Sequence, residues 1–343
     1  MTKPAVLIVG AGATGLPVGY HLALAGAEVT FLVRPGRAGA FAAPQRLYCY
    51  DDAELKMFEG YDVVEHVGQL ADRTFQFVLI TLDGHASRST EGAAMLRDLG
   101  DAIRPTGATV VMSAFGQGIR AHYLETLGLP EDRLLFGFLG MLSHQASAGL
   151  PLHPPTDATH VARAAICYRH PKNRVGFRVQ SGTPAAKRFA ALYDRSGVSR
   201  CARFGKGMAG LYSSIAFPVY AACDLADWAD FATVASDKEL WDLACRAQRE
   251  ITTLPEHGWR GRLLGAVMGP RMTKQVHTRT ERDMLPLDYQ AFNRFHHGGK
   301  VQAQDIRSLR DSLAEGHRQG RPMKALATLL ARIEAHEANT LKA

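Results

Sequence analysis

The strongest constraint on this 343-residue chain is a glycine-rich turn near its N-terminus, Gly10-Ala11-Gly12-Ala13-Thr14-Gly15. This GxGxxG motif follows Ala5–Val9, a continuous aliphatic run of the kind that forms a strand buried on both faces. Residues 16–25 then have helical apolar spacing that stops at Gly26, and Glu28–Val33 is a second strand-like run. A strand, a glycine turn, a helix and another strand within about 30 residues form the setting in which the motif predicts dinucleotide binding.

The three glycines have separate roles in such a turn. Gly10 permits the tight turn, Gly12 lets the backbone approach a pyrophosphate, and Gly15 lets the helix pack closely on the strand. The N-terminus of the helix offers N–H groups and a partial positive charge to phosphate. We therefore predict that the cofactor contacts the whole motif, which consists of Gly10, Ala11, Gly12, Ala13, Thr14 and Gly15.

The end of the second strand indicates which dinucleotide binds. An acid there would hold a ribose 2′-hydroxyl and repel a 2′-phosphate, but the sequence is Val33-Arg34-Pro35-Gly36-Arg37. Arginine offers planar, charge-assisted hydrogen bonds to phosphate, so Arg34 and Arg37 favour NADP(H) over NAD(H). FAD is a further alternative because glycine fingerprints also serve flavins, although flavin sites normally have an acid at this strand end.

Further alternation of strand-like and helical runs predicts a Rossmann-type α/β domain, a doubly wound parallel sheet, up to about residue 200. Strands are expected at Phe75–Leu82, Ala108–Ser113, Leu134–Leu142 and Ala162–Tyr168, with helices at Ala93–Ile103 and Ala185–Ser196. Cofactors bind at the carboxyl ends of such strands, so two more loops should contact the nucleotide. The residues predicted to do so are Thr81, Leu82, Phe115 and Gly116.

From Phe204 onward, strand-like runs disappear and helical spacing dominates. It is clearest at Leu211–Trp228, Lys238–Ile251, Val301–Glu315 and Met323–Glu337, with Gly298–Gly299 expected to be a loop. We therefore divide the chain into an NADP-binding domain, residues 1–203, and a mostly α-helical C-terminal domain, residues 204–343. The second domain is expected to serve substrate binding or dimerisation, which allows for a homodimer.

Composition excludes several classes of function. The 40 Lys and Arg against 33 Asp and Glu leave a formal charge of +7, but there is no basic block, so nucleic acid is not expected as a partner. The five cysteines are scattered without a CxxC pair, which argues against a disulfide framework or a metal site made of cysteines alone and favours a reducing cytoplasm. No window of about 18 apolar residues exists, so no membrane span is expected. The expected partner is a small-molecule substrate.

The segment from Val6 to Gly15 and on through Thr30 to Arg37 resembles the ketopantoate reductase (2-dehydropantoate 2-reductase) family. The plan of a Rossmann domain followed by a helical domain resembles the same family, as does Gly320-Arg321-Pro322 with Leu326 near the end of the chain. The resemblance implies NADPH-dependent reduction of a 2-oxo acid, with the substrate held in the cleft between the domains.

Several positions depart from the residues with which that family works. Asp83 stands where the family has a lysine, and Phe115 where it has an asparagine. The position of the family's catalytic lysine falls at Ala209, with Lys206 as the nearest lysine, and that of its substrate-anchoring glutamate falls at Gln302. These replacements argue against ketopantoate as the substrate. An imine is an alternative, because a protonated C=N already carries its electrophilic charge.

A carbonyl that is reduced by hydride develops alkoxide charge and needs a proton donor or a cation beside it. The predicted catalytic residues are Lys206 with its ammonium, Tyr212 with its phenol and Gln302 with its amide. Other groups could transfer a proton or simply belong to the core, namely Tyr220, His277, His296 and His297. The sequence thus favours an NADP(H)-dependent oxidoreductase acting on a carbonyl or imine. The alternative is a non-catalytic NADP(H)-binding sensor or regulatory protein.

Overall fold

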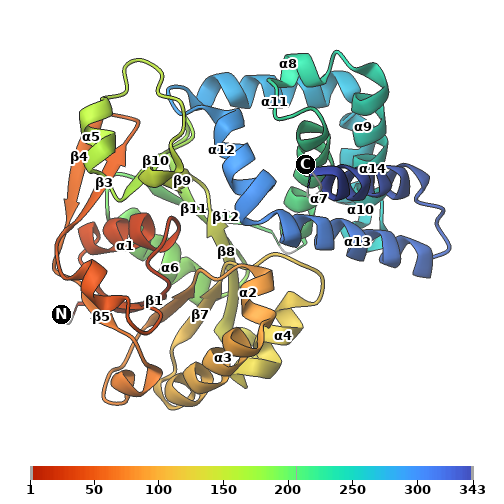
Figure 1. The fold of residues 1–343 in the computed structure, drawn as a ribbon. Helices are drawn as coiled ribbons and strands as arrows, with labels where there is room; N and C mark the ends of the chain where they lie inside the picture. Colours follow the sequence, from red (N-terminus) through yellow and green to blue (C-terminus); the bar gives the residue numbers. More distant parts are fainter. Residues whose placement is uncertain (1–2, 206, 341–343) are drawn as a thin grey trace. The chain divides into compact units, whose positions relative to one another are not determined.

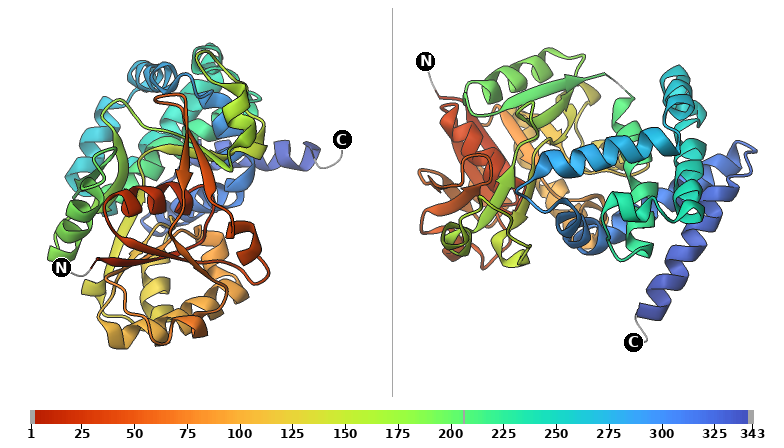
Figure 2. Two further views of the ribbon diagram at one scale, coloured as in Figure 1. Left: turned by 90° about the vertical axis from the view of Figure 1, so that its left-hand side faces the viewer. Right: turned by 90° about the horizontal axis from the view of Figure 1, so that it is seen from above.

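The computed structural model describes residues 3–205 and 207–340 of the chain (Figure 1, Figure 2). These residues form two compact units. Unit 1 comprises residues 3–114 and 118–205, and unit 2 comprises residues 115–117 and 207–340.

Unit 1 is built on an eight-stranded sheet with the order β12-β11-β8-β7-β6-β1-β2-β5. Six neighbouring strands, from β5 to β8, are parallel, whereas β11 is antiparallel to β8 and parallel to β12. The predicted Rossmann-type parallel sheet is therefore confirmed, with two reversed strands added at one edge. The strands are β1 Ala5–Val9, β2 Glu28–Leu32, β5 Asp62–Val64, β6 Phe77–Ile80, β7 Thr109–Met112, β8 Leu134–Leu139, β11 Val175–Gln180 and β12 Arg200–Phe204.

Helices cover both faces of this sheet (Figure 1). α1 connects β1 to β2 and α3 connects β6 to β7, in opposite directions along the sheet, so right-handed crossovers place them on opposite faces. On the α1 face, Ile8, Leu16 and Phe31 are buried in one apolar core. The helices are α1 Gly15–Leu24, α2 Gly84–Arg88, α3 Thr90–Ile103, α4 Ile119–Leu127, α5 Ala158–Arg163 and α6 Pro184–Asp194. Short 3₁₀ turns lie at Ala38–Phe41, Val67–Leu70, Arg104–Thr106, Glu131–Arg133 and Ala146–Ala148.

A second sheet in unit 1 has the strand order β4-β3-β10-β9. It was not predicted, and it corrects two expected strands. The run Leu134–Leu142 is divided, because β8 ends at Leu139 and the next strand begins at Leu142 in the other sheet. The run Ala162–Tyr168 begins inside α5, whose N-terminus is capped by Asp157. The strands are β3 Gln45–Cys49, β4 Glu54–Phe58, β9 Leu142–Gln145 and β10 Ile166–Arg169.

Unit 2 contains no strand over its described residues. Its helices are α7 Met208–Leu225, α8 Phe231–Val234, α9 Lys238–Thr252, α10 Gly258–Val267, α11 Pro270–Met284, α12 Tyr289–Phe295, α13 Gln302–Arg318 and α14 Lys324–Thr340, with a 3₁₀ turn at Pro255–His257. The predicted mostly helical C-terminal part is confirmed. None of the helices described is both long and apolar enough to cross a membrane.

The prediction of a loop at Gly298–Gly299 is wrong. Residues His296–Lys300 form a turn of π-helix between α12 and α13. Its closing bond runs from the Val301 N–H to the His296 carbonyl at 2.8 Å, five residues apart. Two glycines suggested a break in helical structure, whereas here the wider turn continues it.

Candidate functional site

The carboxyl ends of four parallel strands lie level with one another in unit 1. Val9 of β1 is in register with Leu32 of β2 and with Ile80 of β6, which is in register with Met112 of β7. The segments that follow β1, β2 and β6 therefore begin at one edge of the sheet. Three of the predicted cofactor-binding segments begin there, namely Gly10–Gly15, Arg34–Arg37 and Thr81–Leu82.

The glycine turn has the geometry that its sequence predicts. Gly10 has a φ of +98°, and a Cβ on it would lie 2.6 Å from the Thr81 hydroxyl oxygen. A Cβ on Gly15 would lie 1.9 Å from the Gly10 carbonyl oxygen, so α1 could not start where it does with any other residue there. A Cβ on Gly12, which is exposed, would meet nothing within 4 Å, so the backbone there is open to a ligand from outside. These are the roles that the dinucleotide fingerprint requires of its glycines.

In the first turn of α1 the Leu16 N–H already donates to the Gly12 carbonyl at 3.0 Å and Pro17 has no N–H, which leaves the Gly15 N–H for an anion. Thr14 occupies the N-cap position but makes no side-chain cap hydrogen bond, and the first turn contains no acid. Ala13 is buried in the core, so only its backbone can face a ligand. Helix N–H groups without a side-chain acceptor, together with the helix dipole, attract phosphate.

The segment after β2 presents two guanidinium groups to solvent. Arg34 and Arg37 are exposed, and across the described parts of the chain neither side chain has a hydrogen bond or ion pair. The turn that carries them closes with an Arg37 N–H bond to the Arg34 carbonyl at 3.1 Å. It is held in place further on, where the Ala38 N–H donates to the Glu65 carboxylate at 2.6 Å. Both arginines are thus available to an anionic ligand.

The loop after β6 joins the glycine turn through Thr81. The Thr81 hydroxyl donates to the Val9 carbonyl at 2.8 Å, and Leu82 follows it half-buried. Asp83, which replaces the family's lysine, is the N-cap of α2 and accepts from the Ala86 N–H at 2.7 Å. Its carboxylate therefore caps the start of a helix, a structural use that accounts for an acid at this position.

Phe115 and Gly116 follow β7, the strand next to β6. Gly116 has a φ of +135° and Gly118 a φ of +67°, which are backbone conformations that favour glycine. By its contacts Phe115–Gln117 belongs to unit 2 rather than to the sheet that precedes it. Contact of Phe115 and Gly116 with a cofactor stays a prediction.

The three predicted catalytic residues are not brought together by any contact among the described residues. Lys206 lies outside the described residues. Tyr212 is half-buried on α7. Gln302 stands at the start of α13 and donates from its amide to Asp224 at 3.2 Å, while Asp224 also accepts from the Trp228 indole at 2.9 Å. The amide of Gln302 thus links α13 to α7.

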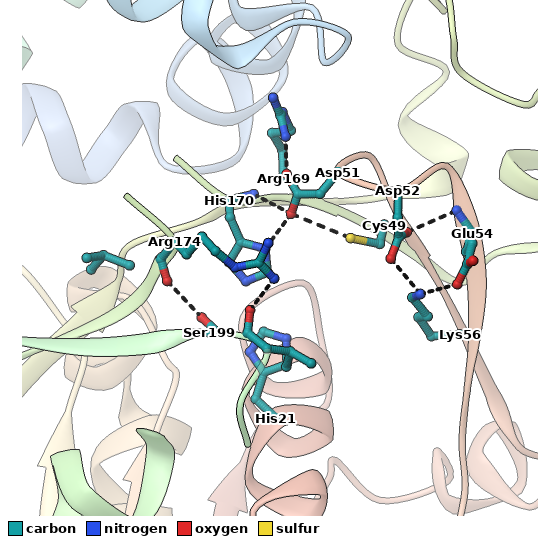
Figure 3. Close-up of polar contacts among 12 residues, drawn as sticks. His21, Cys49, Asp51, Asp52, Glu54, Lys56, Arg169, His170, Arg174 and Ser199 are labelled. Carbon is teal, nitrogen blue, oxygen red and sulfur yellow. Dashed lines mark hydrogen bonds and ion pairs between the residues drawn. The ribbon is translucent and has the colours of Figure 1, made fainter. Parts of the chain in front are cut away.

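A buried polar network that the sequence analysis missed joins β3 to β10 in unit 1 (Figure 3). Asp51 accepts from His170 Nδ1 at 2.5 Å and from the Cys49 thiol at 3.6 Å, and its other oxygen pairs with Arg169. Although burial opposes it, the hydrogen bond and charge of His170 and the charge of Arg169 lower the pKa of Asp51. No spacing rule would find this network, because Asp51 and His170 are 119 residues apart in sequence.

Ligand atoms of Cys49, Asp51 and His170 lie within 4.8 Å of one another, a grouping that can bind metal. The donor set is poorly prepared for a cation, however. One Asp51 oxygen already pairs with the Arg169 guanidinium, and burial raises the pKa of the Cys49 thiol to about 12, which keeps it protonated. The group fits a hydrogen-bonded link between two strands better than a metal centre.

Next to this network, His21 of α1 is fully buried and stacks on His170, with ring centroids 5.3 Å apart. Its Nδ1 is 2.7 Å from the Tyr193 hydroxyl. Burial, and then the positive charges of His170 and Arg174, lower the pKa of His21 to about 3. The helix that begins at the glycine turn is thus anchored by a neutral histidine.

Comparison with known proteins agrees with the motif and with the fold. Residues 6–82 match the family model described as ketopantoate reductase PanE/ApbA. Over these residues the chain is similar to the ketopantoate reductase family. This match covers the glycine turn, Arg34, Arg37, Thr81 and Leu82, and it confirms the resemblance that the sequence suggested. No curated protein matches the sequence.

Solved structures resemble the chain over nearly its whole length. The 2-dehydropantoate 2-reductase of Geobacter metallireducens GS-15 is 16% identical, with a TM-score of 0.68 over 97% of this chain and 99% of that one. The 2-dehydropantoate 2-reductase of Methylococcus capsulatus is 16% identical, with a TM-score of 0.68 over 98% and 97%. A D-mandelate dehydrogenase in complex with NADH and anilino(oxo)acetate is 12% identical, with a TM-score of 0.67 over 98% of each chain. At these identities the likeness is one of fold.

Proposed function

We propose that this protein is an NADP(H)-dependent oxidoreductase that reduces a carbonyl or imine substrate. The observation that carries the proposal is the edge of the sheet in unit 1. There a glycine turn with an open backbone at Gly12 lies beside a strand end that carries Arg34 and Arg37 and no acid.

The residues at this edge suit the parts of the cofactor. Backbone N–H groups of the turn Gly10–Gly15 would hold the pyrophosphate, with the partial positive charge of the α1 N-terminus behind them. Arg34 and Arg37, exposed and without partners among the described residues, would pair with a 2′-phosphate. When bound, the nicotinamide exchanges a hydride with the substrate. The residues of the chain must bind the substrate and supply the proton.

The substrate class follows from the neighbours and from the chemistry. The named neighbours are reductases of 2-dehydropantoate and a dehydrogenase of D-mandelate, so a 2-oxo acid is the first class to test. Asp83 and Gln302 replace a lysine and a glutamate of the family, and both are engaged in contacts within the protein. Ketopantoate is therefore not the expected substrate, and cyclic imines are the second class to test.

The test is a titration followed by a turnover panel. Fluorescence titration should give tighter binding of NADPH than of NADH, because only NADPH gains the two arginine contacts. NADPH oxidation is then followed against 2-oxo acids of varied side chain, ketopantoate and cyclic imines. Turnover of one non-ketopantoate class supports the proposal. Equal binding of NADH and NADPH contradicts the cofactor assignment, and a yellow chromophore on the purified protein would replace it with a flavin.

The same engaged contacts of Asp83 and Gln302 favour a second candidate, a non-catalytic NADP(H)-binding sensor or regulatory protein. Tight NADPH binding without turnover across the whole panel would decide for this candidate. Turnover of any substrate in the panel would exclude it.

A further inference from the structure

Helix α10 in unit 2 turns its large apolar side chains outward. Trp259, Leu263 and Val267 follow one another at intervals of four residues, and their exposed fractions are 63%, 56% and 52%. Residues four apart share one side of an α-helix, so the three form a single apolar stripe. Six of the nine large apolar residues that are exposed in the described parts of the chain lie from Trp259 to Leu285. An ordinary surface helix has the reverse pattern, with its apolar side inward.

Two glycines fix this orientation of α10. Gly261 and Gly265 are buried, and each stands two residues after a member of the stripe, about 200° round the helix. A Cβ on Gly261 would lie 2.1 Å from the Thr252 carbonyl oxygen, and a Cβ on Gly265 would lie 2.8 Å from Thr253 Cγ2. The glycine side of α10 therefore packs closely on the end of α9, and the stripe points away from that contact.

Basic side chains accompany the stripe, and no acid does. Residues 257–280 contain five Lys and Arg and no Asp or Glu, so most of the net charge of +7 stands on this segment. The five bases are exposed and stand singly along α10 and α11, namely at Arg260, Arg262, Arg271, Lys274 and Arg279. Arg279 pairs with Asp283 at 3.6 Å. Arg262, Arg271 and Lys274 have no side-chain hydrogen bond or ion pair within the described part of the chain.

We propose that this surface binds an anionic lipid bilayer. The α10 face is made up of Trp259, Leu263 and Val267 with the bases Arg262, Arg271 and Lys274. The stripe would enter the boundary between headgroups and acyl chains, where tryptophan is enriched, and the bases would pair with headgroup phosphates. The ten residues of α10 extend about 15 Å, so the contact is with the surface of the bilayer only. The proposal does not depend on the reductase function.

The charge of the face favours a bilayer over other occupants. A two-fold contact between two copies would bring the five bases of each copy together, with no acid in the segment to offset them. Nucleic acid would pair with the bases through its phosphates and would leave the apolar stripe without a matching surface. An anionic bilayer supplies acyl chains for the stripe and phosphates for the bases.

The main test is co-sedimentation of the full-length chain with vesicles of phosphatidylcholine and phosphatidylglycerol in equal parts. We expect binding at low salt, and binding about 10-fold weaker to pure phosphatidylcholine or at about 0.5 M salt. Trp259→Gln combined with Leu263→Gln should weaken binding by about 10- to 100-fold at an unchanged thermal midpoint, because both side chains are exposed. Met57→Gln combined with Leu152→Gln, at exposed apolar positions of unit 1, is the matched control and should bind like the wild type.

A second pair of variants tests the charge. Arg262→Gln combined with Lys274→Gln should weaken binding to the anionic vesicles by about 10- to 30-fold, with the thermal midpoint again unchanged. Arg163→Gln combined with Arg188→Gln removes the same charge at exposed positions of unit 1 and should leave binding unchanged.

Tryptophan fluorescence locates the contact. The chain has three tryptophans, and Trp228 and Trp241 are buried, so Trp259 is the one that vesicles can reach. Anionic vesicles should shift its emission to shorter wavelength, and lipids with brominated acyl chains should quench it. Trp259→Phe keeps an apolar side chain, so it should still sediment with the vesicles but lose both the shift and the quenching.

Four results would overturn the proposal. One is a wild type that does not sediment with anionic vesicles at low salt, and another is vesicle binding that the Trp259 and Leu263 changes leave intact. A dimer in analytical ultracentrifugation that these two changes abolish would assign the face to a second copy. Binding of a single-stranded oligonucleotide that depends on Arg262 and Lys274, but not on Trp259 and Leu263, would assign it to nucleic acid. Turnover is measured in none of these tests, so the reductase function stands or falls separately.

Discussion

The two units present polar groups by opposite means. At the sheet edge of unit 1 the groups that we propose to face the cofactor are mostly backbone, in a turn formed by Gly10, Gly12 and Gly15, with two exposed arginines added. In unit 2 the polar cluster is made of side chains: His297 is hydrogen-bonded to Asp305 and stacked on Tyr220. A site made of backbone groups depends on a few consecutive residues whose sequence allows a single backbone conformation. A side-chain site depends on several helices that hold each group in place.

This difference determines how each region should respond to mutation. In unit 1 we expect that one methyl group added at a chosen glycine can weaken cofactor binding without changing the stability of the fold. In unit 2 a polar group can be removed without loss of stability only by a change of similar size and shape, because every group also fills space in a packed interior. The predictions below test the contrast, beginning with the largest effect.

Gly15→Ala should be the most damaging single change at the turn. Its Cβ would lie 1.9 Å from the Gly10 carbonyl oxygen, so β1 and α1 must move apart. We expect the free energy of unfolding to fall by about 3 kcal/mol, as measured by urea denaturation. Gly12→Ala is the control: it should keep the wild-type stability and still weaken NADPH. Equal stability of the two variants would contradict the geometry of the turn.

Loss of both strand-end arginines should change cofactor preference without changing the fold. Arg34→Ala combined with Arg37→Ala should weaken NADPH by about 10- to 100-fold and leave NADH nearly unchanged, since charge-assisted bonds to phosphate are strong. Calorimetric titration measures both affinities. Arg163→Ala of α5 combined with Arg188→Ala of α6, both at exposed positions, serves as a charge-matched control. A parallel loss for NADH would show that the arginines do not read the 2′-phosphate.

His21 should make unit 1 sensitive to acid. Its pKa is about 3 in the folded protein against 6.5 in the unfolded chain, so the unfolded state takes up the proton first as the pH falls. The contribution of neutral His21 to the free energy of unfolding is fully present above pH 6.5. It is lost as the pH falls toward 3, at up to about 1.4 kcal/mol per pH unit. His21→Asn should reduce this slope in denaturation at several pH values, whereas His85→Asn at an exposed site should not. A slope equal to that of the wild type would contradict the anchoring role of His21.

Asp83→Ala should have the smallest effect. It removes the side-chain acceptor from the first turn of α2, which costs about 1 kcal/mol of stability. Asp83→Ser, which keeps a capping oxygen, should recover most of it in thermal denaturation. If Asp83→Ala instead abolished turnover at unchanged stability, the carboxylate would have a chemical role.

Features formed by residues that are neighbours in sequence were predicted well, and features formed by distant segments were predicted poorly. Ala5–Val9 is a strand with the predicted bounds, because a buried aliphatic run next to a glycine turn has few alternatives. The second sheet, β4-β3-β10-β9, was missed because its strands come from distant segments, and the run Ala162–Tyr168, which overlaps β10, was expected in the parallel sheet. His297 was among the candidates, but its partner Asp305 was not, because the contact depends on a π-helical turn that two glycines had suggested was a loop.

Isotope transfer tests the central claim most directly. Wild-type protein is incubated with NADPH carrying deuterium at C4 of the nicotinamide, each stereoisomer separately, and with the 2-oxo acid and imine panel. Mass spectrometry then reads the products. The account predicts that one stereoisomer transfers deuterium to the reduced carbon of a single substrate class, and that ketopantoate gives little product. Tight NADPH binding without deuterium in any product would contradict it.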